Sequence, residues 1–298
     1  MSQHQIYEFL SLDHPLSKQQ QAELRAISSR AQITSTRFFN EYEWGDLDGE
    51  PRRMLATYFD AFLYLANTGS RWLMFKLPLA LIDAEIVDDY CDGELVTLTR
   101  VNDEHALLSL QSCREDDQSI ETYREHVQSL SELIHIREQI IQGDYRALFM
   151  FYVHHLQHHP DANELERGPI IPTDLDRHDS ALEKFTALFG IDDDLISAAA
   201  SLLSKHQKDA HRAPDREREA FIATLTDDQK NALLLAVMTS PDEARHTLLA
   251  KFRQYASPRD AASPRLNPQT VTQLLNTSRS IKKERLRKHQ SGSRTHGE

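Results

Sequence analysis

One stretch constrains the fold of this chain more than any other part of it. It runs from Phe38 to Pro78 and reads FFNEYEWGDLDGEPRRMLATYFDAFLYLANTGSRWLMFKLP. Both tryptophans of the sequence, Trp44 and Trp72, lie in it among many other aromatic residues. Aromatic residues favour strands, whereas clusters of Gly, Asn, Asp and Pro favour turns. The stretch therefore predicts a strand, a turn, a helix and a hairpin in that order.

The strand that opens this stretch is predicted by an alternation of residue types. Phe38, Tyr42 and Trp44 share one face of an extended chain, which predicts that Trp44 belongs to the core. The acidic turn that follows is expected to cap the next helix through Asp46 or Asp48.

Residues 1–114 predict an α+β domain in which helices pack on a mostly antiparallel sheet. Ser17, with Gln20 three residues later, has the spacing of a capping box at the start of the first helix. The second helix is expected from Pro51, which suits a first helical turn, and the third over Ala80–Tyr90. The expected strands are Ile6–Leu12, Ile33–Trp44, Ala61–Ala66, Arg71–Leu77, Leu95–Val101 and His105–Gln111.

After Arg114 the strand signals stop, and an all-α region is predicted. Residues 115–160 form an expected helical hairpin, because apolar residues recur every three or four positions until Gly143 interrupts them. Residues 161–179 are expected to be a linker and 180–255 a set of short helices, one of which begins with a capping box at Thr226. The polar, basic tail over 256–298 is expected to be largely disordered, apart from a short helix near Val271–Leu275.

The distribution of charge and glycine excludes several function classes. Residues 279–298 contain seven Lys or Arg and two Asp or Glu, whereas the rest of the chain carries 27 Lys or Arg against 44 Asp or Glu, a formal charge of −17. An acidic body repels nucleic acid, so only the basic tail is a candidate for binding it. With nine glycines and no glycine-rich phosphate loop, the chain predicts no nucleotide cofactor.

Further composition features predict a cytoplasmic protein. The N-terminus lacks the basic start and apolar run of a signal peptide. The longest apolar runs, such as Ala232–Met238, are far shorter than the roughly 20 residues that span a bilayer, which predicts no membrane partner. The two cysteines have no C-x-x-C spacing, and such sparse usage fits a reducing compartment.

The sequence resembles a set of uncharacterised bacterial proteins of about this length. The resemblance is carried by YEF, LDHPLS, WGD and YFDAFLYLANTGSRWLMFKLP, and it extends through QGDYRALF and ATLTDDQKNALLL. It covers most of the chain and implies a bacterial origin. It implies no activity, because none is established for that family.

Five residues of the first domain are candidates for binding a ligand or partner: Trp44, Asp46, Asp60, Arg71 and Trp72. Arg and Trp dominate the energetics of protein interfaces, and Arg71 next to Trp72 is also suited to a planar or anionic ligand. The alternative is that Trp72 is packed in the core and that Arg71 is solvated. Carboxylates clustered at Asp46 suggest calcium, but the order of residues of a calcium loop is missing.

Four histidines form the segment HHLQHH near the end of a predicted helix. The pairs His154 with His158 and His155 with His159 each have a spacing suited to two metal ligands. At about 100° per residue the two pairs point in different directions, so one helix cannot bring all four to a single ion. We therefore predict no metal site and no cofactor.

Two functional hypotheses follow. The first is a non-catalytic protein-binding module or a subunit of a bacterial cytoplasmic assembly, because catalytic motifs are missing and helical hairpins and aromatic residues are abundant. The second is an enzyme of unrecognised type that acts through an Asp/Arg/His pocket in the N-terminal domain. The partner expected under the first hypothesis is another protein; nucleic acid is expected only at the tail.

Overall fold

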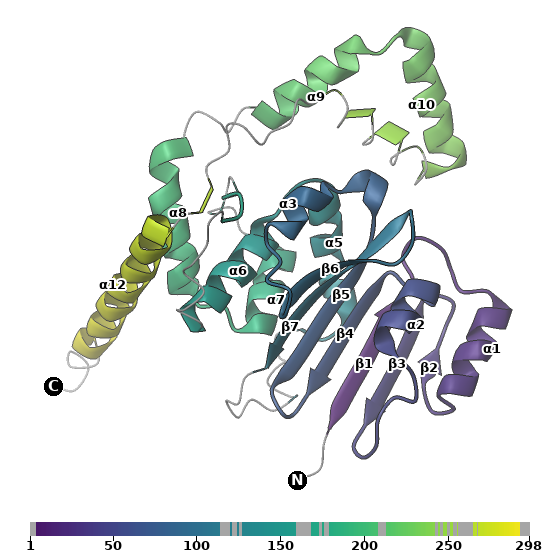
Figure 1. Cartoon of the computed structure of the whole chain (residues 1–298), viewed down its shortest axis with the longest axis horizontal. Helices are drawn as coiled ribbons and strands as arrows, with labels where there is room; N and C mark the ends of the chain where they lie inside the picture. Colours follow the sequence, from purple (N-terminus) through teal and green to yellow (C-terminus); the bar gives the residue numbers. More distant parts are fainter. Residues whose placement is uncertain are drawn as a thin grey trace.

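The chain forms an α+β fold with a sheet in its N-terminal part and helices in the remainder, as predicted. Figure 1 shows this arrangement in the computed structural model. The structure describes residues 4–113, 120, 124, 127–158, 168–172, 175, 179–207, 213–241, 244, 247–248, 251–252, 255, 265–266 and 268–292. Among the helices in these ranges, none is long and apolar enough to cross a bilayer.

The sheet has seven strands in the order β2-β3-β1-β4-β5-β7-β6, and all of its neighbouring strands are antiparallel. The first strand lies in the middle, between β3 and β4. The hairpins predicted on either side of Asn67–Ser70 and of Asn102–Glu104 are confirmed as β4–β5 and β6–β7. The strands are β1 Gln5–Leu10, β2 Gln32–Ile33, β3 Arg37–Tyr42, β4 Ala61–Ala66, β5 Ser70–Pro78, β6 Val96–Arg100 and β7 His105–Cys113.

Helices follow in the positions that capping and periodicity predict. Ser17 caps α1 and Thr226 caps α10, and the reciprocal bonds of a capping box are present at both. The helical elements with defined bounds are α1 Lys18–Ile27, α2 Pro51–Tyr58, η1 Leu79–Leu81, α3 Ala84–Asp88, η2 Leu130–Glu132, α5 Ile134–Ile141, α6 Arg146–His158, α7 Ser180–Phe189, α8 Asp193–Gln207, α9 Ala213–Thr224, α10 Asp227–Thr239 and α12 Pro268–Gly292.

The two faces of the sheet are covered by different parts of the chain (Figure 1). Side chains alternate along β1, so that Tyr7 and Phe9 belong to one hydrophobic cluster and Ile6 and Leu10 to the other. Helices α1 and α2 pack on the first face, which is rich in aromatic rings. Helices α3, α5, α6, α7 and α8 contribute to the second cluster, which also includes residues of α12. One continuous core therefore joins the sheet to the helical region.

The residues just before α12 are bonded to parts of the chain that are distant in sequence. Arg265 pairs with Asp89 at 2.5 Å, and a β-bridge joins Arg265 to Ile170. Leu266 donates its N–H to the carbonyl of Pro169. A Cβ atom at Gly168 would lie 2.1 Å from the carbonyl oxygen of Leu266, so only glycine permits this close approach.

The structure corrects the expectation that the C-terminal tail is largely disordered. Helix α12 is 25 residues long, far longer than the short helix predicted near Val271–Leu275. Val271, Leu274 and Ser278 are buried, and their spacing of three and four residues forms one helical stripe. The composition of the tail is polar because this helix buries only a narrow stripe and leaves its other sides in water.

Three local expectations also need correction. Trp44 is 73% exposed rather than part of the core, because β3 ends at Tyr42 and the alternation does not continue to residue 44. Glu50, and not Asp46 or Asp48, caps α2 by accepting the N–H of Arg53. The first helix of the predicted 115–160 hairpin is not continuous, because Ser129 accepts the N–H of Ser131 and starts the new helical segment η2.

Candidate functional site

The five predicted site residues do not meet in one place. Trp44 is exposed beyond the end of β3, and Arg71 is buried on the face of the sheet that the helical region covers. Trp72 lies on the opposite face, because successive residues of a strand point to opposite sides. Asp60 pairs with Lys76, four residues further along β5 than Trp72. The residues therefore divide into separate clusters.

Asp46 belongs to a hydrogen-bonded group on the aromatic face of the sheet. Its carboxylate accepts the hydroxyl of Tyr7 at 2.5 Å and the N–H of Leu47 at 2.8 Å. Tyr64, on the neighbouring strand β4, donates to the side-chain oxygen of Gln5 at 2.8 Å, and this oxygen also lies 3.1 Å from the Tyr7 hydroxyl. Burial, followed by the bond to Asp46, raises the pKa of the Tyr7 hydroxyl well above its ordinary value. Tyr7 therefore stays a neutral donor, which suits a structural role.

Trp72 forms the second group on this face. Its indole N–H donates to the hydroxyl of Ser109 at 2.7 Å, and its ring lies edge-on to Phe62 with centroids 5.3 Å apart. The guanidinium of Arg52 lies over the indole ring at 5.4 Å from its centroid. These contacts satisfy the polar atom of Trp72 and cover one side of its ring, so the side chain is packed against its neighbours.

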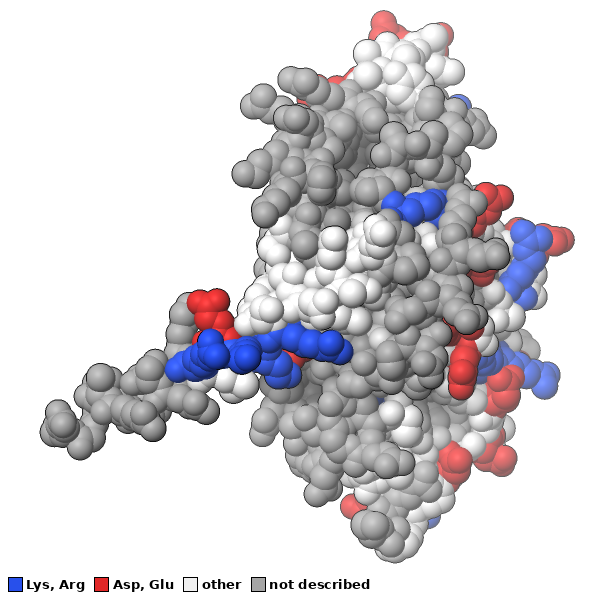
Figure 2. All heavy atoms as spheres, turned by 60° about the vertical axis from the view of Figure 1, so that its left-hand side comes forward, with Lys and Arg blue, Asp and Glu red and all other residues white. Residues whose placement is uncertain are grey.

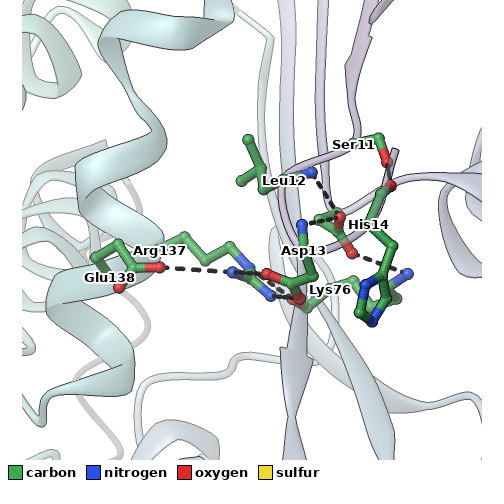
Figure 3. Close-up of polar contacts among 8 residues, drawn as sticks. Ser11, Leu12, Asp13, His14, Lys76, Arg137 and Glu138 are labelled. Carbon is green, nitrogen blue, oxygen red and sulfur yellow. Dashed lines mark hydrogen bonds and ion pairs between the residues drawn. The ribbon is translucent and has the colours of Figure 1, made fainter. Parts of the chain in front are cut away.

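Asp60 is buried and belongs to a cluster of charged side chains that includes Lys76, Asp13 and Arg137, of which Figure 3 labels the last three. One of its oxygens accepts the N–H groups of Leu12 and Asp13 at 2.7 and 3.0 Å, and the other lies 2.9 Å from the ammonium of Lys76. The turn after β1 is held further by Ser11, whose hydroxyl donates to the carbonyl of His14. Asp60 therefore fixes the chain where it leaves β1.

Arg137 joins this turn to the helical region. Figure 3 shows its side chain reaching from α5 towards Asp13. The guanidinium makes two parallel bonds to the Asp13 carboxylate, at 3.1 and 2.6 Å, and a third to the carbonyl of Lys76 at 2.9 Å. The side chain of Arg137 is only 2% exposed, whereas that of Asp13 is 28% exposed. Such a bidentate pair is both strong and directional, so it sets how α5 lies on the sheet.

Glu8 forms a second buried joint between the same two regions. Its carboxylate accepts a bond from Arg37 of the adjacent strand β3 at 2.7 Å. It also accepts the hydroxyl of Ser129 and the N–H of Leu130, at the start of η2. The helical region is thus held at two carboxylates, Glu8 on β1 and Asp13 just beyond its end.

The surroundings of Asp60 and His105 shift the pKa of each group away from pH 7. Burial alone would raise the pKa of Asp60, but Lys76 and the N–H groups of Asp13 and Leu12 outweigh burial, and the pKa is lowered. Burial, with the charge of Lys76 added, lowers the pKa of His105. Asp60 is therefore ionised and His105 is held neutral near pH 7.

The arrangement around Asp60 is better suited to stability than to catalysis. Both oxygens of Asp60 and all three nitrogens of the Arg137 guanidinium have partners within the cluster. A catalytic group must point a free donor or acceptor at a substrate. The bonds named above leave hydrogen-bonding capacity on Lys76, on His105 and on the partly exposed carboxylate of Asp13, but each of these groups except His105 already has an ionic partner.

The four histidines of the HHLQHH segment are only partly described by the structure. His154 is buried and His155 lies 3.6 Å from the carboxylate of Asp92, while the side chain of His158 and all of His159 lie outside the described residues. Within the described part of the chain, no group of three His, Cys, Asp or Glu side chains is placed to hold a metal ion.

Two surfaces stand out that the sequence analysis did not select as sites. Helix α10 has no buried residue and exposes Leu234, Leu235, Val237 and Met238. The signal was the apolar run Ala232–Met238, which we considered only as a possible membrane span. Helix α12 presents a row of Lys and Arg, which Figure 2 shows as a blue band on the surface. Its basic sequence was noted, but not its helical structure.

Comparison with known proteins adds no further site. No protein family, curated protein or solved structure matches the chain.

Proposed function

We propose that the protein is a non-catalytic binding protein that docks helix α10 into an apolar groove on another protein. The observation that carries this proposal is the exposure of four large apolar side chains on one short helix. Met238 is 83% exposed, Leu234 65%, Leu235 63% and Val237 51%. Single exposed apolar residues are ordinary, but a contiguous group of them marks an interaction surface.

The four side chains form one face of the helix. At about 100° per residue they lie within an arc of roughly 160°, with Met238 near its centre. Figure 1 shows α10 lying beyond the sheet and its covering helices. A helix that exposes large apolar side chains at such spacing can insert them into a groove of a partner protein.

Contacts of α9 and of the start of α10 fix the position of α10, and none of them involves its four exposed apolar side chains. Phe221 of α9 is buried and packs against the rings of Phe252 and Tyr255, with centroids 5.4 Å apart in both pairs. Thr226 and Gln229 then fix the start of α10 with their capping box. The apolar face of α10 is therefore presented by a preformed helix, which lowers the entropy cost of binding.

The free energy available from these four side chains shows that a stable complex needs further contacts. Burying a Leu, Val or Met side chain completely contributes about 1.5–3 kcal/mol, so the exposed parts of these four provide on the order of 5 kcal/mol. Association costs at least about 4 kcal/mol in lost freedom, so a stable complex needs further contacts. Ile222 of α9, about half exposed, extends the surface. Asp227 and Asp228 are exposed at the start of α10 and favour a groove with Lys or Arg at that end.

The enzyme alternative receives less support. Of the acidic groups available to its predicted Asp/Arg/His pocket, Asp60 is paired with Lys76, and Asp13 is paired with Arg137 of α5, outside the predicted N-terminal domain. The bonds of that cluster explain how the helical region is attached to the sheet, and they leave few groups for a substrate.

The proposal is tested by recovering partners from a lysate of the source organism with three versions of the chain. The variant Leu234→Ser/Met238→Ser removes the centre of the face, and Glu219→Ser/Ala223→Ser is a control on the exposed surface of α9. We expect one partner to be recovered with the wild type and the control, and at least ten times less of it with the α10 variant. Equal recovery with all three, or no partner together with a turnover in a broad activity screen, would refute the proposal.

A further inference from the structure

Helix α12 carries its positive charges on two different sides. Val271, Leu274 and Ser278 form the buried stripe of α12, and its apolar members belong to the same core cluster as residues of α8. Lys282 and Arg285 continue on that side, where they pair with Asp192 and Asp194 at 2.8 Å each. These two cations therefore attach the helix to the start of α8 and are not available to a ligand.

Three other cations of α12 whose side chains the structure describes form a row on a different side of the helix from Lys282 and Arg285. Arg279, Lys283 and Arg287 are all exposed and follow one another at intervals of four residues. Four residues of α-helix rise about 6 Å, so the three charges extend over about 12 Å along one side of the helix. Among the described residues, none forms an ion pair with any of these three side chains.

We propose that this row, Arg279, Lys283 and Arg287, binds the sugar-phosphate backbone of a nucleic acid. Affinity for that backbone comes from concentrated positive charge, and a line of cations on a preformed helix matches a line of phosphates. Arg adds the ability to bind a phosphate through two parallel hydrogen bonds. The acidic character of the rest of the chain confines binding to this row and keeps it weak.

An anionic membrane surface fits the helix less well. Helices that lie in a membrane interface insert an apolar face several ångströms deep. Among the residues of α12 whose exposure the structure describes, Leu286 is the only exposed large apolar side chain, because Val271 and Leu274 are already buried. A charged but nearly apolar-free surface favours a hydrated polyanion.

The experiment measures the binding of a fluorescein-labelled 30-nucleotide single-stranded RNA and of a 30-base-pair DNA duplex to the full chain by anisotropy. Salt is varied from 25 to 200 mM. Three phosphate contacts predict a slope of log K against log salt of about −2 for the single strand and about −3 for the duplex. The variant Arg279→Gln/Lys283→Gln/Arg287→Gln should lose at least ten-fold in affinity at 50 mM salt and show a slope near zero.

A control variant separates this row from the net charge of the protein. Lys18→Gln/Arg30→Gln/Arg100→Gln removes the same number of exposed cations from the sheet region and should keep both the affinity, within two-fold, and the slope. Circular dichroism checks that the α12 variant keeps its helix content. The proposal is overturned if the wild type binds neither nucleic acid at 25 mM salt, if the control loses as much affinity as the α12 variant, or if only vesicles of anionic lipid are bound.

Discussion

Replacing Arg137 with Met tests whether the charged joint holds α5 on the sheet. Met keeps most of the aliphatic stem but removes three hydrogen bonds, two to Asp13 and one to the carbonyl of Lys76. Leaving a buried carbonyl without a partner costs about 1–3 kcal/mol. Removing one member of a buried ion pair costs about 3–5 kcal/mol, but Asp13 is 28% exposed and regains water. We therefore expect the free energy of unfolding to fall by about 2–4 kcal/mol.

The assay is urea unfolding followed by tryptophan fluorescence in a Trp44→Phe background, so that Trp72 alone reports on the sheet. Asp13→Asn, Arg137→Met and the double variant complete a double-mutant cycle, which isolates the energy of the pair. Arg53→Met, at an exposed position of α2, is the control and should change stability by less than about 0.5 kcal/mol.

The reasoning fails if Arg137→Met costs less than about 1 kcal/mol, or if the cycle gives a coupling energy near zero. Either result would mean that the apolar contacts of α5 hold the helical region without help from the guanidinium. A large loss in Arg137→Met with no coupling to Asp13 would likewise contradict the role given to the bidentate pair, and would assign the effect to the Lys76 carbonyl alone.

Two further predictions use the same unfolding assay. Glu50→Ala removes the cap of α2 and should cost about 1 kcal/mol, whereas Asp48→Ala should change stability by less than about 0.5 kcal/mol; equal effects would contradict the assignment of the cap. The pKa of Asp60 is lower in the folded protein than in the unfolded chain, so the unfolded state binds more protons and stability falls as the pH drops below about 3.9. In the Asp60→Asn variant the urea midpoint should therefore depend less steeply on pH between pH 3 and pH 5. An unchanged slope there would count against the ionised Asp60–Lys76 pair.

Local patterns in the sequence predicted most elements of the sheet, but the single strand expected over Ile33–Trp44 is two strands, β2 and β3, that pair with each other. Alternation and turn residues identify both hairpins, and the spacing of Ser17 and Gln20 gives the start of α1, because each depends only on residues close together in sequence. Trp44 shows the limit of that reasoning. The alternation that places it with Phe38 holds only while the strand continues, and the strand ends before it, close to the turn at Gly45, whose φ is 92°.

The charged cluster at Asp13 and Arg137 could not be predicted from local patterns, because it joins residues that are distant in sequence. Arg137 and Asp13 are 124 residues apart in the sequence. No local pattern marks such a pair, since its geometry depends on where α5 comes to lie on the sheet. The face of α10 is a different case. Its apolar run was visible, but only the structure shows that the fold leaves this run in water.

The position of the covering helices has a consequence for synthesis on the ribosome. The sheet is encoded by residues up to Cys113, but the helices that complete the cluster on its second face come from residues between Leu130 and the end of α8 at Gln207, and α12 then packs against α8. At about 5–20 residues per second, translating the roughly 90 residues between these points takes on the order of 5–20 s. During that interval the face that includes Ile6, Leu63, Leu73 and Leu110 lacks the cover of α5 to α8 and has only the short elements η1 and α3 on it, so we expect the nascent sheet to bind chaperones that shield apolar surface.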